Sequence, residues 1–408
     1  MTTTAAEART VVISNQTLFV VALIACVSTG PLAMQLFFPA VPFITREFAS
    51  HPAVSQLAIS LSMAAMAFAT VAYGPLSDRY GRRPLMMGGL LIFLAGTVVC
   101  AVAPDIETLI AGRIIQAAGG AAGSVMTRAV VRDVYGPDRS ASLMAYMMVA
   151  MVVAPLIALN IGGLLTDAVG WRAGFWFAFA FGVVVFLLLR RGVPESHLGE
   201  RIATRPAVIM RAYLVLLRSP DFNGYAGHAA FAVSTFFAFM AAAPAIMVET
   251  LNSTAFEFSL NFIVLTVTFM AANALAGRIS TRLGIDRMVW LGGGVSLISA
   301  AALFASLWWW GLNTWSLFLP VAFVGVGNGL SIPNASAGAI NTDARLIGTA
   351  SGLSAFLMLA VSAAVTQLVG EFADGSAWPL AWFIFGATVA SIGLGAIPRW
   401  RKRRRSLP

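Results

Sequence analysis

Long apolar runs alternate with short polar segments along the whole chain. The apolar runs reach about 20 residues or more, enough for a helix to cross a hydrocarbon core about 30 Å thick. The short alternating strands of a membrane β-barrel do not dominate here, and helices satisfy their own backbone hydrogen bonds in lipid. The pattern predicts an all-α integral membrane protein with twelve spans, at residues 17–44, 53–76, 84–103, 106–130, 139–165, 171–190, 222–248, 257–280, 287–309, 313–336, 346–370 and 378–398.

The polar segments divide the basic residues very unequally between the two sides of the membrane. With the N-terminus in the cytoplasm, 23 of the 26 Lys and Arg residues fall in cytoplasmic segments, and only Arg46 and Arg172 fall outside. This is the positive-inside bias that orients membrane helices. It predicts that both termini are cytoplasmic. It also explains the net charge of +9 as a topology signal, so we expect no nucleic-acid partner.

Composition supports a multi-pass membrane protein. Hydrophobic residues make up 59% of the chain and charged residues 11%, with a mean hydropathy of +0.84. Soluble domains carry about 25% charged residues. Cys26 and Cys100 both lie inside apolar spans, so we expect no disulfide framework. The first span is longer than the core of a signal peptide, and we expect it to be retained.

The longest connection divides the chain near its middle. Residues 191–221 are polar and basic, and they predict a cytoplasmic linker between an N-terminal half, residues 1–190, and a C-terminal half, residues 222–398, with a basic tail at residues 399–408. A short repeat, displaced by 203 positions, favours duplication of the two six-helix halves. Gly74, Ser77, Arg79 and Gly81 recur as Gly277, Ser280, Arg282 and Gly284.

The loop after the second span reads GPLSDRYGRRP over residues 74–84. A basic loop with turn glycines would require neither the Asp nor this order. The segment resembles the G-x-L-S-D-R-x-G-R-R signature of the major facilitator superfamily. The resemblance implies a charge-assisted latch that holds the two halves closed on the cytoplasmic side. Its residues would be Gly74, Asp78, Arg79, Gly81, Arg82 and Arg83.

Arg113 is the one basic residue predicted inside a span. A charge at such a depth costs at least about 2.5–3.5 kcal/mol, so it should face a cavity or a partner. The alternative is an arginine that extends to the nearby outer surface. The segment from Arg113 through Gln116 to Gly120 resembles the second motif of the same superfamily, which favours a role in substrate binding or proton coupling.

The resemblance extends along almost the whole chain to the drug-efflux branch of bicyclomycin and chloramphenicol exporters. It rests on MQLFFPAVP at residues 34–42, RAVVRD at residues 128–133 and IPNA at residues 332–335. Exporters of this branch exchange protons for drugs and open alternately to either side. The resemblance implies a substrate site near the membrane midplane between the halves.

Two positions depart from this branch. Gln35 stands where the branch usually has an Asp, and a glutamine cannot carry a proton. The exporter motif G-P-x-x-G-G of the fifth helix here reads ALNIGG at residues 158–163, so its Gly-Pro bend is missing. Pro155 could supply a bend nearby.

Titratable groups are scarce in the predicted spans. All 17 acids fall in loops or near span ends. His228 is the only histidine inside a predicted span. Histidine titrates near neutrality, so His228 is a candidate proton carrier. A packed, hydrogen-bonded histidine is the alternative.

Polar and aromatic residues of the spans form a candidate substrate cavity. A cavity that holds Arg113 and no acid favours neutral or anionic molecules, although each residue considered could equally serve helix packing. The candidates for binding and coupling are Gln35, Phe38, Arg113, Gln116, Asn160, His228, Phe231 and Asn334. Asn328, Phe37 and Phe239 could add hydrogen bonds and apolar surface.

These features predict a secondary active transporter that exports small molecules in exchange for protons. An importer or facilitator of an organic anion or metabolite is the main alternative, because fold does not settle direction or cargo. A membrane enzyme is disfavoured because His51, His197 and His228 are scattered, and a sensor without transport is a further alternative. We expect no metal, nucleotide or other cofactor. The basic tail could bind anionic lipids or simply fix topology, and resembling proteins act as monomers.

Overall fold

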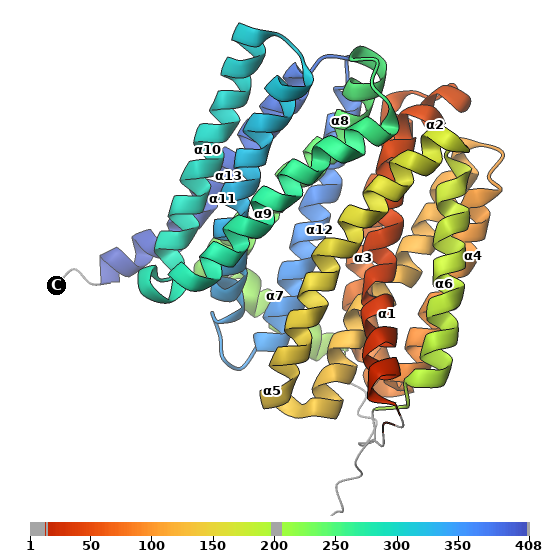
Figure 1. Ribbon diagram of the computed structural model, residues 1–408. Coiled ribbons are helices and arrows are strands. Elements are labelled where there is room, and N and C mark those ends of the chain that lie inside the picture. The colour runs from red at the N-terminus through yellow and green to blue at the C-terminus, as the bar shows by residue number, and fades with distance from the viewer. Residues whose placement is uncertain (1–12, 14, 197–205, 406–408) are drawn as a thin grey trace, which may run out of the picture.

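The computed structural model of the chain describes residues 13, 15–196 and 206–405. Within this part every regular element is helical, and Figure 1 shows the helices as a long bundle. The first half contains α1 (Gln16–Phe37), η1 (Phe38–Ala40), α2 (Val41–Glu47), α3 (Pro52–Tyr80), α4 (Arg82–Ala101), α5 (Ile106–Ala168) and α6 (Arg172–Gly192). The second contains α7 (Pro206–Leu217), α8 (Pro220–Ala245), η2 (Ile246–Thr250), α9 (Ala255–Leu283), α10 (Ile285–Trp310), α11 (Thr314–Ile340), α12 (Ile347–Glu371) and α13 (Trp378–Arg405).

The membrane spans agree with the sequence prediction of an all-α fold. Among the described residues, 11 helical stretches are long and apolar enough to cross a membrane, and a shorter apolar stretch covers Val153–Ala168. The 11 stretches correspond to eleven of the twelve predicted ranges, and the shorter one covers only the later part of the predicted fifth span, residues 139–165. The fold class, with two six-helix halves, is thereby confirmed.

The boundary between the fourth and fifth spans differs from the prediction. The sequence predicted a break between residues 130 and 139, but α5 stays helical from Ile106 to Ala168. Figure 1 shows that α5 turns back on itself at the end of the molecule where α1 begins. Helical hydrogen bonds pair the backbone N–H and C=O groups of this polar segment. The segment therefore does not interrupt the helix.

The first predicted span also differs in detail. It is divided by the 3₁₀ turn η1, which contains Pro39, and it continues as α2, in which Pro42 occupies the first turn. Proline lacks the N–H that an α-helix interior requires, so these prolines break the regular hydrogen-bond ladder. The result is a change of helix type at Phe38, beside the interface between the two halves.

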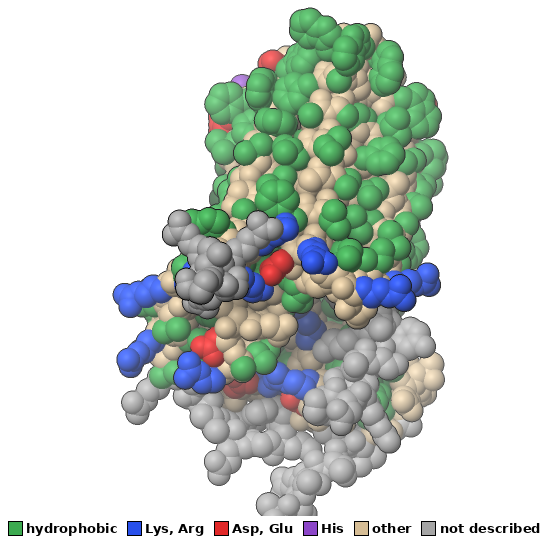
Figure 2. Space-filling view, turned by 90° about the vertical axis from the view of Figure 1, so that its left-hand side faces the viewer, with side chains coloured by type: hydrophobic (Ala, Val, Ile, Leu, Met, Phe, Trp, Pro, Cys, Tyr) green, Lys and Arg blue, Asp and Glu red, His purple; other side chains and the backbone are tan. Residues whose placement is uncertain are grey.

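The two ends of the molecule are named here by their helix termini. The basal end is where α1 begins at Gln16 and α3 ends at Tyr80, and the distal end is where α2 ends at Glu47 and α9 begins at Ala255 (Figure 1). Figure 2 shows a broad band of hydrophobic side chains above Lys and Arg side chains gathered toward the basal end. Exposed apolar residues such as Ile298 belong to the surface expected to face lipid.

Glycines allow the third and fourth helices of each half to pack closely. A Cβ on Gly96 of α4 would lie 2.3 Å from the backbone nitrogen of Gln116 on α5. In the second half, a Cβ on Gly292 of α10 would lie 2.4 Å from the carbonyl oxygen of Gly327 on α11. Small residues at such crossings bring helix backbones together in membranes. The same packing device therefore recurs in both halves.

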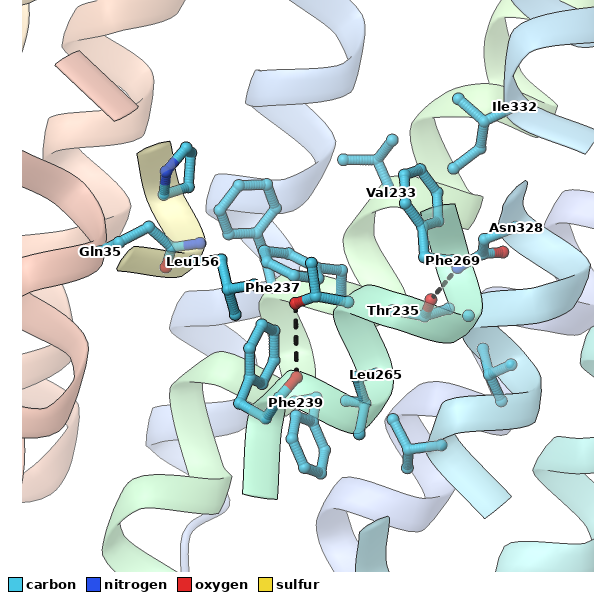
Figure 3. A pocket seen from close by; sticks show the side chains of 17 residues that line it. Gln35, Leu156, Val233, Thr235, Phe237, Phe239, Leu265, Phe269, Asn328 and Ile332 are labelled. Atoms are coloured by element: carbon cyan, nitrogen blue, oxygen red, sulfur yellow. Dashed lines mark hydrogen bonds between the residues drawn. The ribbon is translucent and has the colours of Figure 1, made fainter. Parts of the chain in front are cut away.

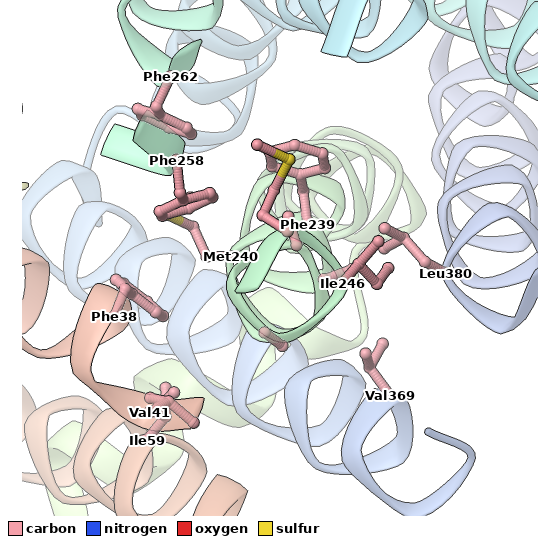
Figure 4. Packing of buried hydrophobic residues seen from close by; sticks show 14 of the residues in the cluster. Phe38, Val41, Ile59, Phe239, Met240, Ile246, Phe258, Phe262, Val369 and Leu380 are labelled. Atoms are coloured by element: carbon pink, nitrogen blue, oxygen red, sulfur yellow. The ribbon is translucent and has the colours of Figure 1, made fainter. Parts of the chain in front are cut away.

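The apolar core is continuous between the halves at the distal end and separate at the basal end. One buried cluster combines Phe38 and Ile59 of the first half with Phe239, Phe258 and Val369 of the second (Figure 4). Toward the basal end, one cluster lies wholly in the first half and another wholly in the second. Among the described residues, the buried cluster that the two halves share lies near their distal ends.

Candidate functional site

A cavity of about 310 Å³ lies between the two halves (Figure 3). Gln35 of α1 and Pro155 and Leu156 of α5 form its wall on the side of the first half. Helices α8, α9 and α11 form the rest, through Val233, Thr235, Phe236, Phe237, Phe239, Phe262, Leu265, Thr266, Phe269, Val321, Val324, Gly325, Asn328 and Ile332.

Phenylalanine rings dominate the wall on the side of the second half. The rings of Phe236 and Phe237 are 5.1 Å apart between centroids, and those of Phe236 and Phe262 are 5.7 Å apart. Phe239 stacks on Phe262 with an interplanar angle of 26°. Rings in mutual contact are held in place, so they present a preformed surface for apolar and aromatic groups.

Most polar groups of the wall are already engaged within the protein. The Asn328 Nδ2 donates to the carbonyl oxygen of Ala232 at 3.0 Å and to Thr235 Oγ1 at 2.9 Å, while its Oδ1 accepts from Ser296 Oγ at 3.3 Å. Thr266 donates to the carbonyl oxygen of Phe262 at 3.3 Å. These side chains brace α8, α9, α10 and α11 and have little capacity left for a ligand.

Gln35 is the exception. It is 9% exposed, and its Oε1 is buried without a hydrogen-bond partner. A buried unsatisfied polar atom costs about 1–3 kcal/mol. Figure 3 shows the side chain reaching from α1 toward Leu156 at the cavity wall. None of the 17 lining residues is acidic or basic, so the cavity carries no formal charge.

Arg113 lies in the first half, away from this cavity. It lines a separate pocket of about 20 Å³ together with Gln116. Its Nη1 donates to Gln116 Oε1 at 2.6 Å and to the carbonyl oxygen of Ala33 at 3.4 Å, and its Nε donates to that of Ala58 at 3.5 Å. The guanidinium carbon lies 4.3 Å from the centroid of the Phe37 ring. Carbonyl dipoles and the ring face therefore offset the cost of the buried charge.

His228 is a residue of α8 that faces α10 and α13, and it does not line the cavity. Its Nδ1 lies 3.0 Å from both the carbonyl oxygen and the Oγ of Ser391, and Ser391 Oγ also donates to the carbonyl oxygen of His228. Its Nε2 is buried and has no partner among the described residues. A Cβ on Gly395 would meet the ring at 2.8 Å, so α13 packs directly against it.

The other candidate residues occupy different places in the fold. Phe38 belongs to the shared distal core, with its ring 6.5 Å from that of Phe237. Asn160 donates to the carbonyl oxygen of Leu156 at 2.9 Å, and Asn334 to that of Leu330 at 2.9 Å. Phe231 is half-buried on α8 outside the cavity wall. Of the eight candidates, Gln35 alone lines the larger cavity.

Several wall residues were not singled out from the sequence. Phe262, Leu265, Thr266 and Phe269 follow the spacing of one helix face, which is a usable signal. That signal does not show whether the face meets lipid, the same half or the opposite half. Asn328 and Phe239 were considered from the sequence, and both line the cavity.

The signature loop forms a compact polar cluster at the basal end. Arg82 Nη1 binds Asp78 Oδ1 at 2.8 Å and also Ser77, and Arg82 Nε binds Asp133 Oδ2 at 3.1 Å. The backbone nitrogens of Arg82 and Arg83 donate to the Glu195 carboxylate at 3.0 and 3.2 Å. The described partners of these groups belong to the first half.

The remaining residues of the loop make fewer contacts. Gly81 has a φ of 97°, and a Cβ there would lie 2.6 Å from Glu195 Oε2, so a glycine is required on both counts. Arg79 is exposed, with its guanidinium 5.2 Å from the ring of its neighbour Tyr80. Gly74 has open space beside it. In this state the loop braces α3, α4, α5 and the segment after α6.

The basal end of the second half has its own cluster, which includes part of the basic tail. Lys402 binds Asp286 at 2.8 Å and Tyr225 at 3.1 Å. Arg401 binds Asp221 at 3.2 Å. These contacts join α13 to α8 and α10, so two tail residues are engaged within the protein.

Polar contacts connect the two halves at the distal end. Both carboxylate oxygens of Asp167 on α5 accept from the first turn of α9, from the backbone nitrogens of Ala255 at 3.1 Å and Phe256 at 2.8 Å. A Cβ on Gly163, one turn earlier, would lie 2.5 Å from Ser259 Oγ. The α5–α9 contact is therefore close and capped by a charge at a helix N-terminus.

A second set of distal contacts joins α3 to α8 and α12. Gln56 Nε2 donates to the carbonyl oxygen of Ala241 at 2.7 Å. Ser60 donates to Gln367 at 2.8 Å, and Gln367 donates to the carbonyl oxygen of Ala53 at 3.1 Å. These contacts and the shared apolar core close the cavity at its distal end.

Comparison with known sequences gives one consistent result. The family model of the Major Facilitator Superfamily matches residues 21–366. The chain is 26% identical to a bicyclomycin resistance protein homolog of Haemophilus influenzae, over 89% of this chain and 91% of that protein. It is 27% identical to multidrug resistance protein D of Escherichia coli, over 81% and 83%, and 26% identical to a chloramphenicol resistance protein of Pseudomonas aeruginosa, over 91% and 88%.

Solved structures support the fold. A peptide transporter in complex with alafosfalin matches with a TM-score of 0.76 and 15% identity, over 94% of both chains. A bacterial homologue of the lysosomal transporter Spinster matches with a TM-score of 0.74 and 14% identity, over 93% of this chain and 94% of that one. With its apolar helices and bacterial relatives, the protein is a multi-pass protein of the inner membrane. The chain belongs to the Major Facilitator Superfamily and is a transporter.

Proposed function

We propose that the protein exports small, mainly neutral molecules from the cytoplasm by alternating access, driven by proton influx. The observation that carries the proposal is the cavity between the two halves, which is aromatic, uncharged and closed at the distal end by a core that both halves share. Midplane sites between two halves are the usual arrangement in secondary transporters.

The orientation follows from the basic residues. Positive-inside bias assigns the basal end, which carries most Lys and Arg side chains, to the cytoplasm. The described structure is then an inward-facing state, since the hydrogen bonds that join the halves among the described residues lie at the opposite end. The cavity lies between the two halves of the same chain, which is compatible with a monomer as the working unit.

Export is better supported than uptake of an anion. The named relatives are resistance proteins for bicyclomycin, chloramphenicol and multiple drugs, which act on small organic molecules. An organic anion would need a basic partner in the cavity, and Arg113 is committed to Gln116 and to backbone carbonyls elsewhere. The alternative of an anion importer therefore has less support.

Proton coupling needs a carrier outside the cavity wall, because none of the lining side chains titrates near neutrality. We propose His228 as this carrier. Its Nε2 has no partner among the described residues and can accept a proton without breaking the contacts of Nδ1. Because the His228 ring packs against α13, its protonation would act on the helices of the second half through this packing contact rather than through the ligand.

The test is accumulation of labelled neutral, anionic and cationic drugs in pump-deficient cells that express the chain. Export predicts lower accumulation than in cells with an empty vector, and a protonophore should reverse the difference. His228→Gln should retain the fold and lose the response to the protonophore. Accumulation that is unchanged or raised and indifferent to the protonophore would contradict proton-driven export.

A further inference from the structure

The amide of Gln35 is the feature of the cavity that the protein itself leaves unused. Asn328, Thr235 and Thr266, the other hydrogen-bonding side chains of the wall, are engaged within the protein. Gln35 is nine-tenths buried, and its buried Oε1 has no hydrogen-bond partner. Buried polar groups in folded proteins are almost always paired, so this amide points to a missing partner.

The chemistry of an amide defines the group that would satisfy it. Oε1 accepts a hydrogen bond and Nε2 donates two, and the terminal torsion of glutamine is broad enough to present either atom. A second amide, placed side by side, pairs with both at once: its N–H donates to Oε1 and its carbonyl oxygen accepts from Nε2. A group that only accepts would leave Oε1 unpaired.

The rest of the cavity restricts the ligand further. Five phenylalanines line it, and its volume of about 310 Å³ lies at the small end of the range for ligand pockets, about 300–1,000 Å³. No charged side chain lines the wall, so an ion would lose its water without gaining a partner. These constraints favour a compact, neutral, aromatic molecule.

We propose that Gln35 is the specificity-determining residue of this cavity and that it selects neutral aromatic molecules carrying an amide-type donor–acceptor pair. The proposal rests on the proposed transport function and names the substrate class of that same site. The aromatic part of the ligand would pack against Phe236, Phe237 and Phe262 of the second half, while its amide would pair with Gln35 of the first half.

The experiment is equilibrium binding to the purified full-length protein in lipid nanodiscs. Three radiolabelled probes share a naphthalene ring: 1-naphthamide, methyl 1-naphthoate, which lacks a donor, and 1-naphthylmethylamine, which is a cation at neutral pH. Each is measured with the wild type and with Gln35→Met, which keeps side-chain length and removes the amide. The ratio between proteins cancels the different intrinsic hydrophobicity of the probes.

We expect Gln35→Met to weaken 1-naphthamide binding by about three- to tenfold more than methyl 1-naphthoate binding, which is about 0.7–1.4 kcal/mol at 1.4 kcal/mol per tenfold. Retained binding of the ester shows that the variant is folded. Gln35→Glu should raise binding of the cationic probe by at least about tenfold, because it places a carboxylate on an otherwise uncharged wall.

The matched control is Thr266→Val, in the same cavity. Its hydroxyl already bonds within α9, so its loss should change both neutral probes equally. Equal weakening of the amide and the ester in Gln35→Met would overturn the proposal. So would a selective loss of amide binding in Thr266→Val, or a failure of Gln35→Glu to bind the cation.

Transport of the same probes into proteoliposomes separates this proposal from the proposed function. Selective binding through Gln35 without movement of any probe would contradict transport and leave the assignment of the site intact. Movement of the amide and the ester at equal rates, in the wild type and in Gln35→Met alike, would support transport and overturn the role of Gln35.

Discussion

The distal and basal ends of this molecule are held together in opposite ways. At the distal end the halves share one apolar core, and Asp167 and Gln56 bond across the interface. At the basal end each half closes on itself, through Arg82 in the first and Lys402 in the second. The difference shows which contacts a change of access must break. Under the alternating access proposed above, the distal contacts would open while the two basal clusters approach each other as units.

The two basal clusters also differ in the sign of the charge that lies at the start of their helix. Arg82 begins α4 and binds the acids Asp78 and Asp133, whereas Asp286 lies in the first turn of α10 and binds Lys402 from the basic tail. The loops are related by the repeat at Gly81 and Gly284, yet their charges are reversed. Each half is therefore stabilised internally, which supports movement of the halves as rigid bodies.

The largest effect is expected from Gly163→Leu. A Cβ at this position already lies 2.5 Å from Ser259 Oγ and 2.6 Å from the carbonyl oxygen of Ala255, so a larger side chain pushes the distal ends apart. Overpacking costs about 1–3 kcal/mol, which disfavours the closed state by about 5–150-fold. Transport into proteoliposomes should fall accordingly. Gly294→Leu, where a Cβ meets no atom within 4 Å, is the control, and equal losses in both variants would contradict the distal assignment.

The next effect is a loss of stability in Arg82→Ala. The variant removes charge-assisted bonds to Asp78 and Asp133, which are worth about 2 kcal/mol together after allowance for their partial exposure. Thermal unfolding in detergent should shift downward while distal accessibility is unchanged. Arg79→Ala, which loses only an exposed ring contact, should unfold like the wild type. If Arg79→Ala abolishes transport nonetheless, the proposed latch acts in another state of the cycle.

A smaller change in the population of the distally closed state is expected from Asp167→Asn. The amide keeps one acceptor for the first turn of α9 but loses the charge, and helix capping of this kind is worth about 0.5–2 kcal/mol. The population should move toward a state open at the distal end. Labelling of Thr266→Cys in the cavity by an impermeant thiol reagent from the distal side should rise by at least about twofold. Unchanged labelling would show that Asp167 does not hold this end closed.

The smallest effect is expected from Arg46→Gln. Arg46 Nε and Glu249 Oε1 lie 3.6 Å apart across the distal interface, but the two side chains are 55% and 40% exposed. Exposed pairs contribute about 0–1 kcal/mol and are screened by salt. Transport should change by less than about twofold, and any change should disappear at high salt. A large effect that is insensitive to salt would mean that the distal seal depends on this pair rather than on the buried core.

Local signals explain what the sequence predicted about the fold. An apolar run long enough to cross a membrane is visible without any knowledge of its neighbours, so eleven of the spans could be located in full and the fifth in part. The signature at residues 74–84 identified the family for the same reason. The continuous helix through residues 131–138 could not be predicted, because polar residues are compatible with both a loop and a tight helical turn.

The cavity was harder to predict because it depends on which helix faces meet. The apolar helices carry no polar stripe that distinguishes the interface from the lipid surface, so Phe262 and Phe269 were missed while Phe231 was included. Arg113 was expected to need a cavity or a partner. Two of its partners are the backbone carbonyls of Ala33 and Ala58, on helices remote in sequence, and such groups leave no trace in a residue pattern.

The most direct test of the account is a pair of distances measured in nanodiscs by double electron–electron resonance. One spin-label pair, at Val169 and Asn252, reports the distal end, and another, at Tyr80 and Thr281, reports the basal end, each in a chain without Cys26 and Cys100. Addition of 1-naphthamide across a range of pH should populate a second state, in which the distal distance lengthens as the basal distance shortens. Two distances that stay fixed, or lengthen together, would contradict alternating access around this cavity.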